Sequence, residues 1–270
     1  MKLEATTIQS HHIKQFFSSL KEQINDTDLE CTPTGIRILA IDTTRIVCVH
    51  AELNGSSFEK YECKQSFTIG IDVMSINKIL KHTVNGDILT LFVDSDENYE
   101  YTGDRLGIKI RNDQKGEDCT FYIDAIDTNI DTFRPEELNY PVNLSMPSND
   151  LQSIIGRLKN TGSDVLQLVY KNGELKFFAK GDVAQATINR RKPDNNTNHN
   201  NICVKRDDND TLIMVYLGIN KISEFTKCTV LSQYVTIYLQ NDNPVFFEYQ
   251  IGSLGQIRLG LSPRSVPENW

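Results

Sequence analysis

The sequence lacks the features of membrane, secreted and disulfide-rich proteins. None of its apolar runs approaches the roughly 20 residues that span a bilayer, and its first twelve residues, MKLEATTIQSHH, contain no apolar signal core. The six cysteines form no C-x-x-C pair, which favours reduced intracellular thiols over disulfides or a zinc site. These absences predict a soluble protein that binds no membrane and is not secreted by a standard signal.

Motifs for catalysis are also missing. The chain has no phosphate-binding loop, no G-x-G-x-x-G and no G-x-S-x-G. Its five histidines show no metal-ligand spacing, and Asp124, Asp127 and Asp131 are better explained as solvent-facing charges of a linker than as metal ligands. We therefore expect no catalytic residue, no cofactor and no metal, and we expect that the protein is not an enzyme.

What the sequence does contain is typical of a globular protein with one large or two medium domains. Of its 270 residues, 39% are hydrophobic and 24% are charged, and the net charge is −8. This length is enough to bury a substantial core.

Helical spacing of apolar residues is clearest over 73–84, where Val73, Ile76, Leu80 and Val84 form one stripe and Asn85-Gly86 ends the pattern. Three more amphipathic helices are predicted over 9–24, 147–160 and 218–228, with Ser148 as a plausible N-cap of the third. Their expected buried residues are Ile13, Phe16, Phe17, Leu20 and Ile24, then Leu151, Ile154, Ile155 and Leu158, and last Ile219, Ile222 and Phe225.

Strand-like segments lie between these helices. Asn172-Gly173 predicts a tight hairpin turn, because both residues accept a positive φ. Strands are expected over 35–41, 45–53, 58–71, 88–93, 97–101, 106–111, 118–125, 140–146, 165–170, 174–179, 183–190, 202–207, 211–217, 234–240, 245–251 and 256–261. One helix followed by several strands recurs four times at nearly even intervals, which predicts an α+β fold of two similar domains, each with two helices on antiparallel sheets. The predicted domains are 1–123 and 140–270, joined by an acidic connector over 124–139.

Positive charge is concentrated on the four predicted helices. They carry eight basic residues and three acidic ones (Glu22, Asp150 and Glu224), so they hold +5 while the rest of the chain holds −13. The eight are Lys14, Lys21, Lys78, Lys81, Arg157, Lys159, Lys221 and Lys227. Nucleic-acid phosphate is the natural partner for such a distribution, although four ordinary solvated helix faces would give the same pattern. No aromatic residue interleaves with these cations, which argues against stacking on single-stranded bases.

Several segments resemble the proliferating cell nuclear antigen family, the eukaryotic DNA sliding clamps. The helix–strand unit SINKILK and GDILTL (75–81 and 86–91) is similar to that of the family, and LAIDTTRI (39–46) is similar to its L-x-x-M-D-x-x-H-V stretch. Further matching segments are FTKCTVLS (225–232), NPVFFEY (243–249) and LSPR (261–264). The similarity covers essentially the whole chain in order and spacing, apart from the loop over 191–211.

The resemblance implies a ring of three identical chains around duplex DNA, with helices lining the hole and sheets outside. Lys14, Lys21, Lys78, Lys81 and Lys227 correspond to the family's DNA-facing lysines. Two arginines of the family's third helix are replaced by Ser153 and Gly156. Nearby Arg157 and Lys159 are candidates to supply that charge, and Lys221 stands where the family has an aromatic residue.

The resemblance also implies two protein contacts. A pocket for short peptides of partner proteins would include Ile41, Arg45, Ile46, Cys48, Phe133, Pro244 and Pro263. Subunits would pair through an edge strand over 119–125, containing Phe121 and Ile123, and one over 183–190, containing Ala186 and Ile188. Core packing alone would also explain Ile41, Ile46 and Phe133.

The function implied by the resemblance is a nuclear processivity factor. It would bind double-stranded DNA without sequence preference, tether DNA polymerase and other replication and repair proteins, and be loaded by a separate ATP-dependent clamp loader. Two alternatives remain open: a specialised clamp-like subunit (checkpoint or viral) that acts as a monomer or in a hetero-ring, and an unrelated β-rich interaction protein.

Overall fold

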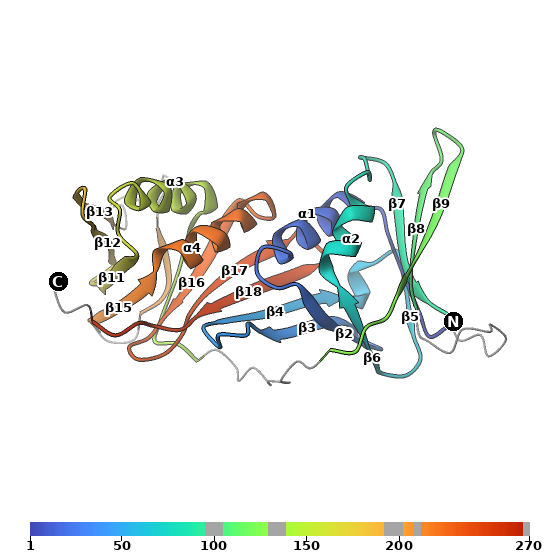
Figure 1. Ribbon diagram of the computed structural model, residues 1–270, viewed down its shortest axis with the longest axis horizontal. Helices are drawn as coiled ribbons and strands as arrows, with labels where there is room; N and C mark the ends of the chain where they lie inside the picture. Colours follow the sequence, from blue (N-terminus) through green and yellow to red (C-terminus); the bar gives the residue numbers. More distant parts are fainter. Residues whose placement is uncertain (95–104, 129–138, 192–201, 208–211, 267–270) are drawn as a thin grey trace. The chain divides into compact units, whose positions relative to one another are not determined.

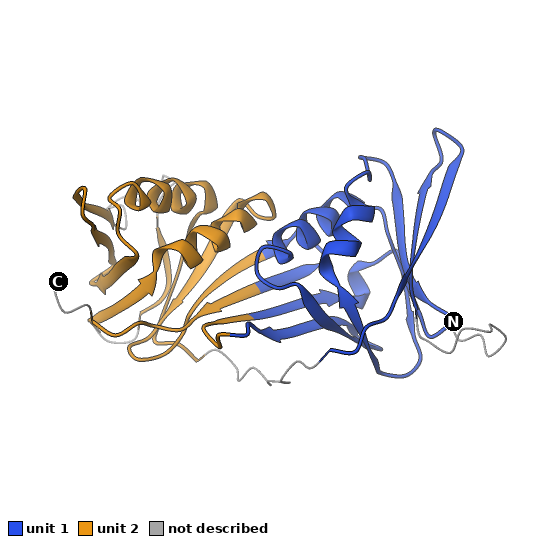
Figure 2. Ribbon diagram, viewed as in Figure 1, with its two compact units in different colours: residues 1–43, 49–134, 250–257 blue, residues 44–48, 135–249, 258–270 orange. Residues whose placement is uncertain are grey.

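The computed structural model describes residues 1–94, 105–128, 139–191, 202–207 and 212–266. They fold into two compact units (Figure 2). Unit 1 comprises residues 1–43, 49–134 and 250–257, and unit 2 comprises 44–48, 135–249 and 258–270. The boundary passes through the strands β4 (Val47–Asn54), β17 (Val245–Ile251) and β18 (Gly255–Leu261).

Unit 1 carries two helices and two groups of antiparallel strands (Figure 1). The helices are α1 (Ser10–Leu20) and α2 (Val73–Leu80), which contact each other, and a short 3-10 turn, η1, spans Gly55–Ser57. A five-stranded sheet has the order β5-β1-β7-β8-β9, and a second group has the order β3-β2-β6. Their bounds are β1 Leu3–Thr7, β2 Asp26–Thr32, β3 Gly35–Ile41, β5 Lys60–Cys63, β6 Phe67–Asp72, β7 Ile88–Val93, β8 Arg105–Asn112 and β9 Glu117–Asp124.

Unit 2 has a similar composition of elements. Its helices are α3 (Ser148–Lys159) and α4 (Ile219–Phe225), and α4 continues into the 3-10 helix η2 (Thr226–Val230). A four-stranded antiparallel sheet has the order β13-β12-β11-β15, and a second group has the order β14-β10-β16-β17. Their bounds are β10 Val142–Pro147, β11 Val165–Lys171, β12 Glu174–Lys180, β13 Gln185–Arg191, β14 Cys203–Asp207, β15 Ile213–Gly218 and β16 Tyr234–Leu239.

Burial of one apolar stripe explains each helix. In α1 the predicted residues Ile13, Phe16, Phe17 and Leu20 are at most 1% exposed, and they face buried β-strand residues such as Ile36 and Ile38. The predicted inward residues of α3 and α4 are buried too. These stripes fix which face each helix turns to its sheet, and hence which face carries the lysines.

The predicted hairpin at Asn172-Gly173 is confirmed. The two residues have φ of 52° and 75°, and Lys171 pairs with Glu174 across the turn. The α+β architecture, with two helices in each unit on antiparallel sheets, is confirmed as well.

Several local predictions are wrong. Helix α2 ends at Leu80, so Val84 lies outside it and is 46% exposed, while Thr83 is buried. Ser148 is the first helical residue rather than the N-cap, and its hydroxyl donates to the backbone carbonyl of Ser232. The predicted strand 58–71 is two strands, β5 and β6.

The sequence analysis did not predict two of the strands, β1 and β2. Strand β1 is only five residues long and β2 contains three acidic residues, so each has few apolar residues, although burial alternates along both. The predicted strand over 97–101 lies outside the described residues.

Candidate functional site

The helix cations of unit 1 differ in how they are held. Lys14 Nζ donates to the backbone carbonyl of Thr83 at 2.8 Å and so ties α1 to the end of α2. Lys21 Nζ lies 3.8 Å from a carboxylate oxygen of Glu22. The side chains of Lys78 and Lys81 are exposed and have no hydrogen-bond or ion-pair partner among the described residues. These two are therefore available for a ligand without breaking an internal contact.

The helix cations of unit 2 also differ in their contacts. Lys221 forms an ion pair of 3.1 Å with Glu224 on the same helix. Arg157 hydrogen-bonds to the carbonyl and hydroxyl of Ser153, at 3.3 Å each, one helical turn earlier. Lys159 and Lys227 are exposed on α3 and η2. Helix α3 packs against α4 and η2, so these side chains belong to one packed group of helices.

Asp72 and Asp87 stabilise the two ends of α2. The carboxylate of Asp72 accepts from the backbone N–H groups of Met74 and Ser75, at 2.9 and 3.2 Å, and caps the helix. Past its other end, buried Asp87 accepts from the N–H of Val84 at 2.8 Å and from Asn112 Nδ2 at 2.6 Å. The loop after α2 is thus tied to the β8–β9 hairpin.

The predicted subunit-contact residues lie on two edge strands. β9 ends the five-stranded sheet, and β13 ends the four-stranded sheet. Phe121, on β9, is 40% exposed and lines a hollow of about 300 Å³ together with Lys78, Ile79, Val84 and Cys119. Ile123, Ala186 and Ile188 are partly exposed. Neither edge has a further strand partner within the described part of the chain.

Unit 2 brings several predicted peptide-pocket residues together. The carbonyl of Ile46 accepts from the N–H of Ser262, next to Pro263, at 2.9 Å. Tyr140 donates its hydroxyl to the carbonyl of Pro244 at 2.7 Å. Burial, and next the electrostatic effect of neighbouring Cys48, raise the pKa of Tyr140 to about 12. Ile46 is 39% exposed, so this group leaves an apolar side chain at the surface.

The remaining pocket residues are placed separately. Arg45 is exposed with φ of 57°, a left-handed conformation that is uncommon for a residue other than glycine. Ile41 lies on β3 in unit 1 and is half-buried. Phe133 lies outside the described residues.

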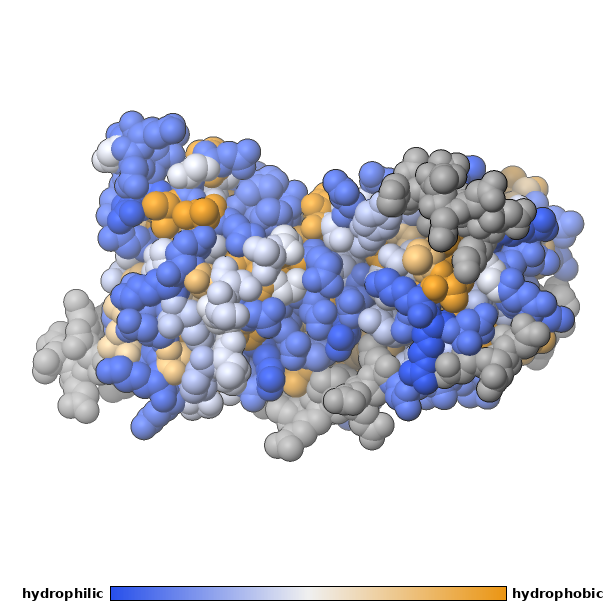
Figure 3. All heavy atoms as spheres, turned by 180° about the vertical axis from the view of Figure 1, so that it is seen from behind, coloured by the Kyte–Doolittle hydropathy of each residue, from blue (hydrophilic) through white to orange (hydrophobic). Residues whose placement is uncertain are grey.

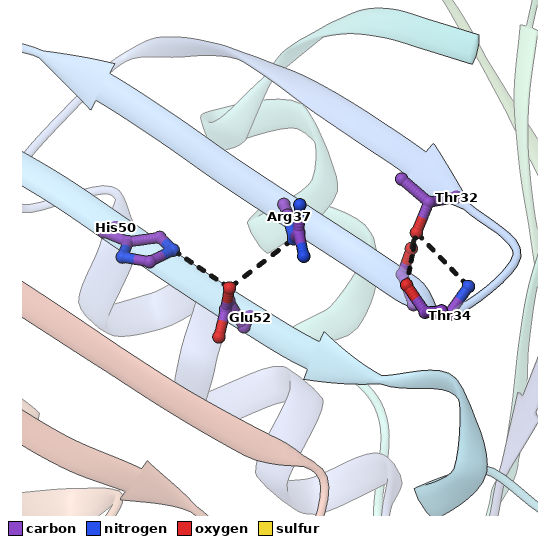
Figure 4. Close-up of polar contacts among 6 residues, drawn as sticks. Thr32, Thr34, Arg37, His50 and Glu52 are labelled. Carbon is purple, nitrogen blue, oxygen red and sulfur yellow. Dashed lines mark hydrogen bonds and ion pairs between the residues drawn. The ribbon is translucent and has the colours of Figure 1, made fainter. Parts of the chain in front are cut away.

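The sheet face of β3 and β4 that turns away from α1 is largely neutralised in unit 1. Glu52 lies 3.3 Å from His50 Nε2 and 3.5 Å from Arg37 Nε (Figure 4). Thr32 and Thr34 hydrogen-bond through their hydroxyls at 3.0 Å beside this group. Glu52 thus compensates the charge of Arg37 on this part of the surface.

Metal ligands and membrane-spanning helices do not occur in the described part of the chain. No group of three or more histidine, cysteine, aspartate or glutamate residues there could hold a metal ion. No described helix is long and apolar enough to cross a bilayer.

Both halves of the chain match models of one protein family. Residues 2–132 match the family model "Proliferating cell nuclear antigen, N-terminal domain", and residues 135–264 match "Proliferating cell nuclear antigen, C-terminal domain". The proliferating cell nuclear antigen of Dictyostelium discoideum is 28% identical over 261 residues, covering 97% of this chain and 98% of that protein. The probable DNA polymerase sliding clamp 1 of Paramecium bursaria Chlorella virus 1 is 26% identical over 258 residues, covering 95% of both.

Both halves of the chain thus match their own family model, in the order expected and with only two residues between the matches, so the chain belongs to the proliferating cell nuclear antigen family.

Proposed function

We propose that the protein is a DNA sliding clamp, which encircles double-stranded DNA without sequence preference and holds DNA polymerase at its template. The observation that carries this proposal is the match of both halves of the chain to the clamp family. Relatives named as a proliferating cell nuclear antigen and as a probable DNA polymerase sliding clamp support it over nearly the full length.

The charge distribution fits this role physically. A protein of net charge −8 repels DNA from most of its surface, whereas its helices carry an excess of cations. Exposed lysines without internal partners, such as Lys78 and Lys81, can contact phosphates and exchange them rapidly. A closed ring is retained by its topology, so weak contacts of this kind are enough and sliding stays fast.

We further propose that the ring is a homotrimer closed by pairing of β9 in one chain with β13 in the next. Both are edge strands, and an unpaired edge favours association. The hollow beside Phe121 lies next to this edge. Pairing of the edge would cover the hollow, and side chains of the neighbouring subunit would fill it.

Partner proteins would bind through short peptide motifs at Ile41, Arg45, Ile46, Cys48, Phe133, Pro244 and Pro263. The exposed Ile46 and the apolar group around Tyr140 support an apolar anchor site. We also propose that an ATP-dependent loader opens the ring and that the protein acts in the nucleus, both by analogy with the family.

A specialised clamp subunit is the second candidate. Ser153 and Gly156 replace the arginines of the family on α3, and the viral relative shows that such chains also occur outside cellular replication. A monomeric mass in solution, or assembly only with a second clamp chain, would favour this candidate.

Retention on circular DNA tests the clamp proposal. The ring is loaded on nicked circular DNA, and its dwell time is measured for the wild type and for Lys78→Glu with Lys81→Glu. We expect a dwell time about tenfold shorter, because two phosphate contacts become repulsive. The pair Lys2→Glu with Lys64→Glu makes the same change of net charge on exposed residues outside the helices and should leave the dwell time unchanged. Equal dwell times for the wild type and the helix variant would refute the assignment.

A further inference from the structure

The four-stranded sheet of unit 2 has a second face that carries none of the predicted DNA-binding, peptide-pocket or subunit-contact residues. Alternate residues such as Leu168, Phe177 and Val215 are buried, on the side where α3 and α4 contact the sheet (Figure 1). The intervening residues point the other way and, apart from buried Gly218, are exposed or partly exposed. We call this second side the outer sheet face.

The outer sheet face is cationic in an acidic protein. Glu174 is its only acidic residue among those described, and it lies 3.2 Å from Arg191 Nε. The guanidinium of Arg264 lies over Gly218, where a side chain on residue 218 would come within 3.3 Å of it. The basic residues of the outer sheet face are Lys171, Lys176, Lys180, Arg191 and Arg264.

Aromatic rings stand between these cations. Phe178 on β12 and Tyr216 on β15 both pair with Gln167 on the strand between them, so the three form one row across the sheet. Neighbouring strands are about 4.8 Å apart, which places the two rings on the order of 10 Å apart. Lys176 Nζ lies 5.8 Å from the centre of the Phe178 ring, and Gln167 Nε2 donates to the Tyr216 hydroxyl at 2.9 Å.

The strand edge near Tyr216 is also held in place. The N–H of Arg264 donates to the carbonyl of Tyr216 at 2.7 Å. Asn241 Oδ1 accepts from the N–H of Met214 at 2.9 Å, and its amide donates to the carbonyl of Leu212 at 3.0 Å. Tyr216 therefore lies on a strand whose edge is held by hydrogen bonds, rather than on a loop. Figure 3 shows hydrophobic atoms (orange) beside strongly hydrophilic ones (deep blue) on the half that holds unit 2.

We propose that the outer sheet face binds single-stranded nucleic acid. Cations track a phosphate backbone, and flat rings offer stacking surfaces to unpaired bases, each worth about 1–3 kcal/mol. A duplex hides its bases and would use only the cations. An acidic protein segment would likewise gain little from the two rings, so the combination favours single strands over both.

Binding of a labelled oligothymidylate to the full-length protein, followed by fluorescence anisotropy at low salt, tests this proposal. We expect Phe178→Leu and Tyr216→Leu each to weaken binding at least fivefold, because leucine keeps the apolar bulk but offers no ring to stack on. Tyr234→Leu, which removes a 42% exposed tyrosine on β16, is the matched control and should bind like the wild type. Lys176→Gln with Arg264→Gln should make binding less sensitive to salt. The slope of the logarithm of the binding constant against the logarithm of the salt concentration should become less steep by roughly 0.7 per lost phosphate contact.

The experiment separates this site from the helix cations. Lys78→Glu with Lys81→Glu should leave oligothymidylate binding within twofold of the wild type, and Phe178→Leu should leave retention on circular duplex unchanged. Three results would overturn the proposal: no oligothymidylate binding, losses with the helix variant but not with the ring variants, or equal competition by an oligoglutamate peptide of matched charge. The last result would identify a site for acidic protein segments instead.

Discussion

At the scale of single residues, the lysines of the helices differ in their contacts. The count of helix cations treats Lys14, Lys78 and Lys221 as equal, but only Lys78 lacks an internal partner among the described residues. Lys14 is bound by the carbonyl of Thr83, which is 69 positions away in the sequence. A contact of this kind follows from packing of two helices and has no local sequence signal.

Buried tyrosines make stability depend on pH at the alkaline end. Tyr140 and Tyr238 both have a pKa raised to about 12, chiefly by burial, which disfavours the tyrosinate. Their ordinary value is about 10, so the stabilisation is fully present below pH about 10 and is lost as the pH rises toward about 12.

Urea unfolding over this pH range checks the prediction. We expect the free energy of unfolding to decline slightly from pH about 9, because burial also raises the pKa of the Cys31 thiol from 9.0 to about 12, and to decline more steeply above pH about 10, where the tyrosines contribute. Tyr140→Phe should make the decline shallower, because one of the tyrosines no longer titrates. An unfolding free energy that stays constant up to pH about 11 would contradict burial of these tyrosines as the cause.

At the scale of elements, the sequence predicts a structure correctly where neighbouring residues determine the backbone conformation. The Asn172-Gly173 turn needs positive φ at two successive residues, and the sequence supplies residues that tolerate it. The prediction of an N-cap at Ser148 is wrong because the chain enters α3 through Pro147. The serine hydroxyl instead donates to the carbonyl of Ser232, which lies 84 positions later in the sequence.

The sequence of β12 shows which residues share a face of the strand, but it does not show which face is exposed. The residues ELKFFAK place Lys176, Phe178 and Lys180 on one face. An aromatic residue between two lysines points to a binding surface only when that face of the strand is known to be exposed. The structure identifies the exposed face through the burial of Leu175, Phe177 and Ala179 on the other.

Gly70 holds the first residues after β9 close to β6. The N–H of Ile126 donates to the carbonyl of Gly70 at 3.0 Å, and a Cβ at residue 70 would lie 2.1 Å from the carbonyl oxygen of Ile126. We expect Gly70→Ala to lower the free energy of unfolding by about 1–3 kcal/mol, because two backbone segments must move apart.

Gly156→Ala is the opposite case and serves as the control. Gly156 lies on the exposed side of α3, and nothing stands within 4 Å of its would-be Cβ. Alanine there should raise the free energy of unfolding by about 1 kcal/mol through helix propensity. Urea titration measures both variants, and equal stability of Gly70→Ala and the wild type would show that residues 125–128 do not need this close approach.

At the scale of the whole molecule, the edge strands are the sites at which we propose that chains assemble. β9 and β13 lie at the ends of different sheets in different units, and each has a free side among the described residues. A closed ring would pair both edges in every chain, which removes two sites of aggregation at once.

Light scattering after size-exclusion chromatography checks this expectation. The wild type should have three times the mass of the 30.7 kDa chain. Phe121→Asp should give the mass of a single chain, because a carboxylate would be buried in an apolar contact. Met74→Asp makes the same kind of change at a residue of similar exposure, 38% against 40%, on α2 and should remain trimeric. If both variants keep the wild-type mass, β9 is not the contact.

The amino-acid sequence by itself determined the fold class, the four helices with their buried stripes, the hairpin at Asn172-Gly173 and the excess of cations on helices. These depend on the spacing of residue types along the chain, and short-range physics acts on that spacing directly. The tertiary structure alone decided that the side chains of Lys78 and Lys81 have no partner among the described residues and that Val84 is exposed. It also decided that Phe178 and Tyr216 lie on the same sheet face as five basic residues. The physical reason is that partners for a side chain are chosen by packing of segments far apart in sequence, and strand pairing sets which residues become neighbours.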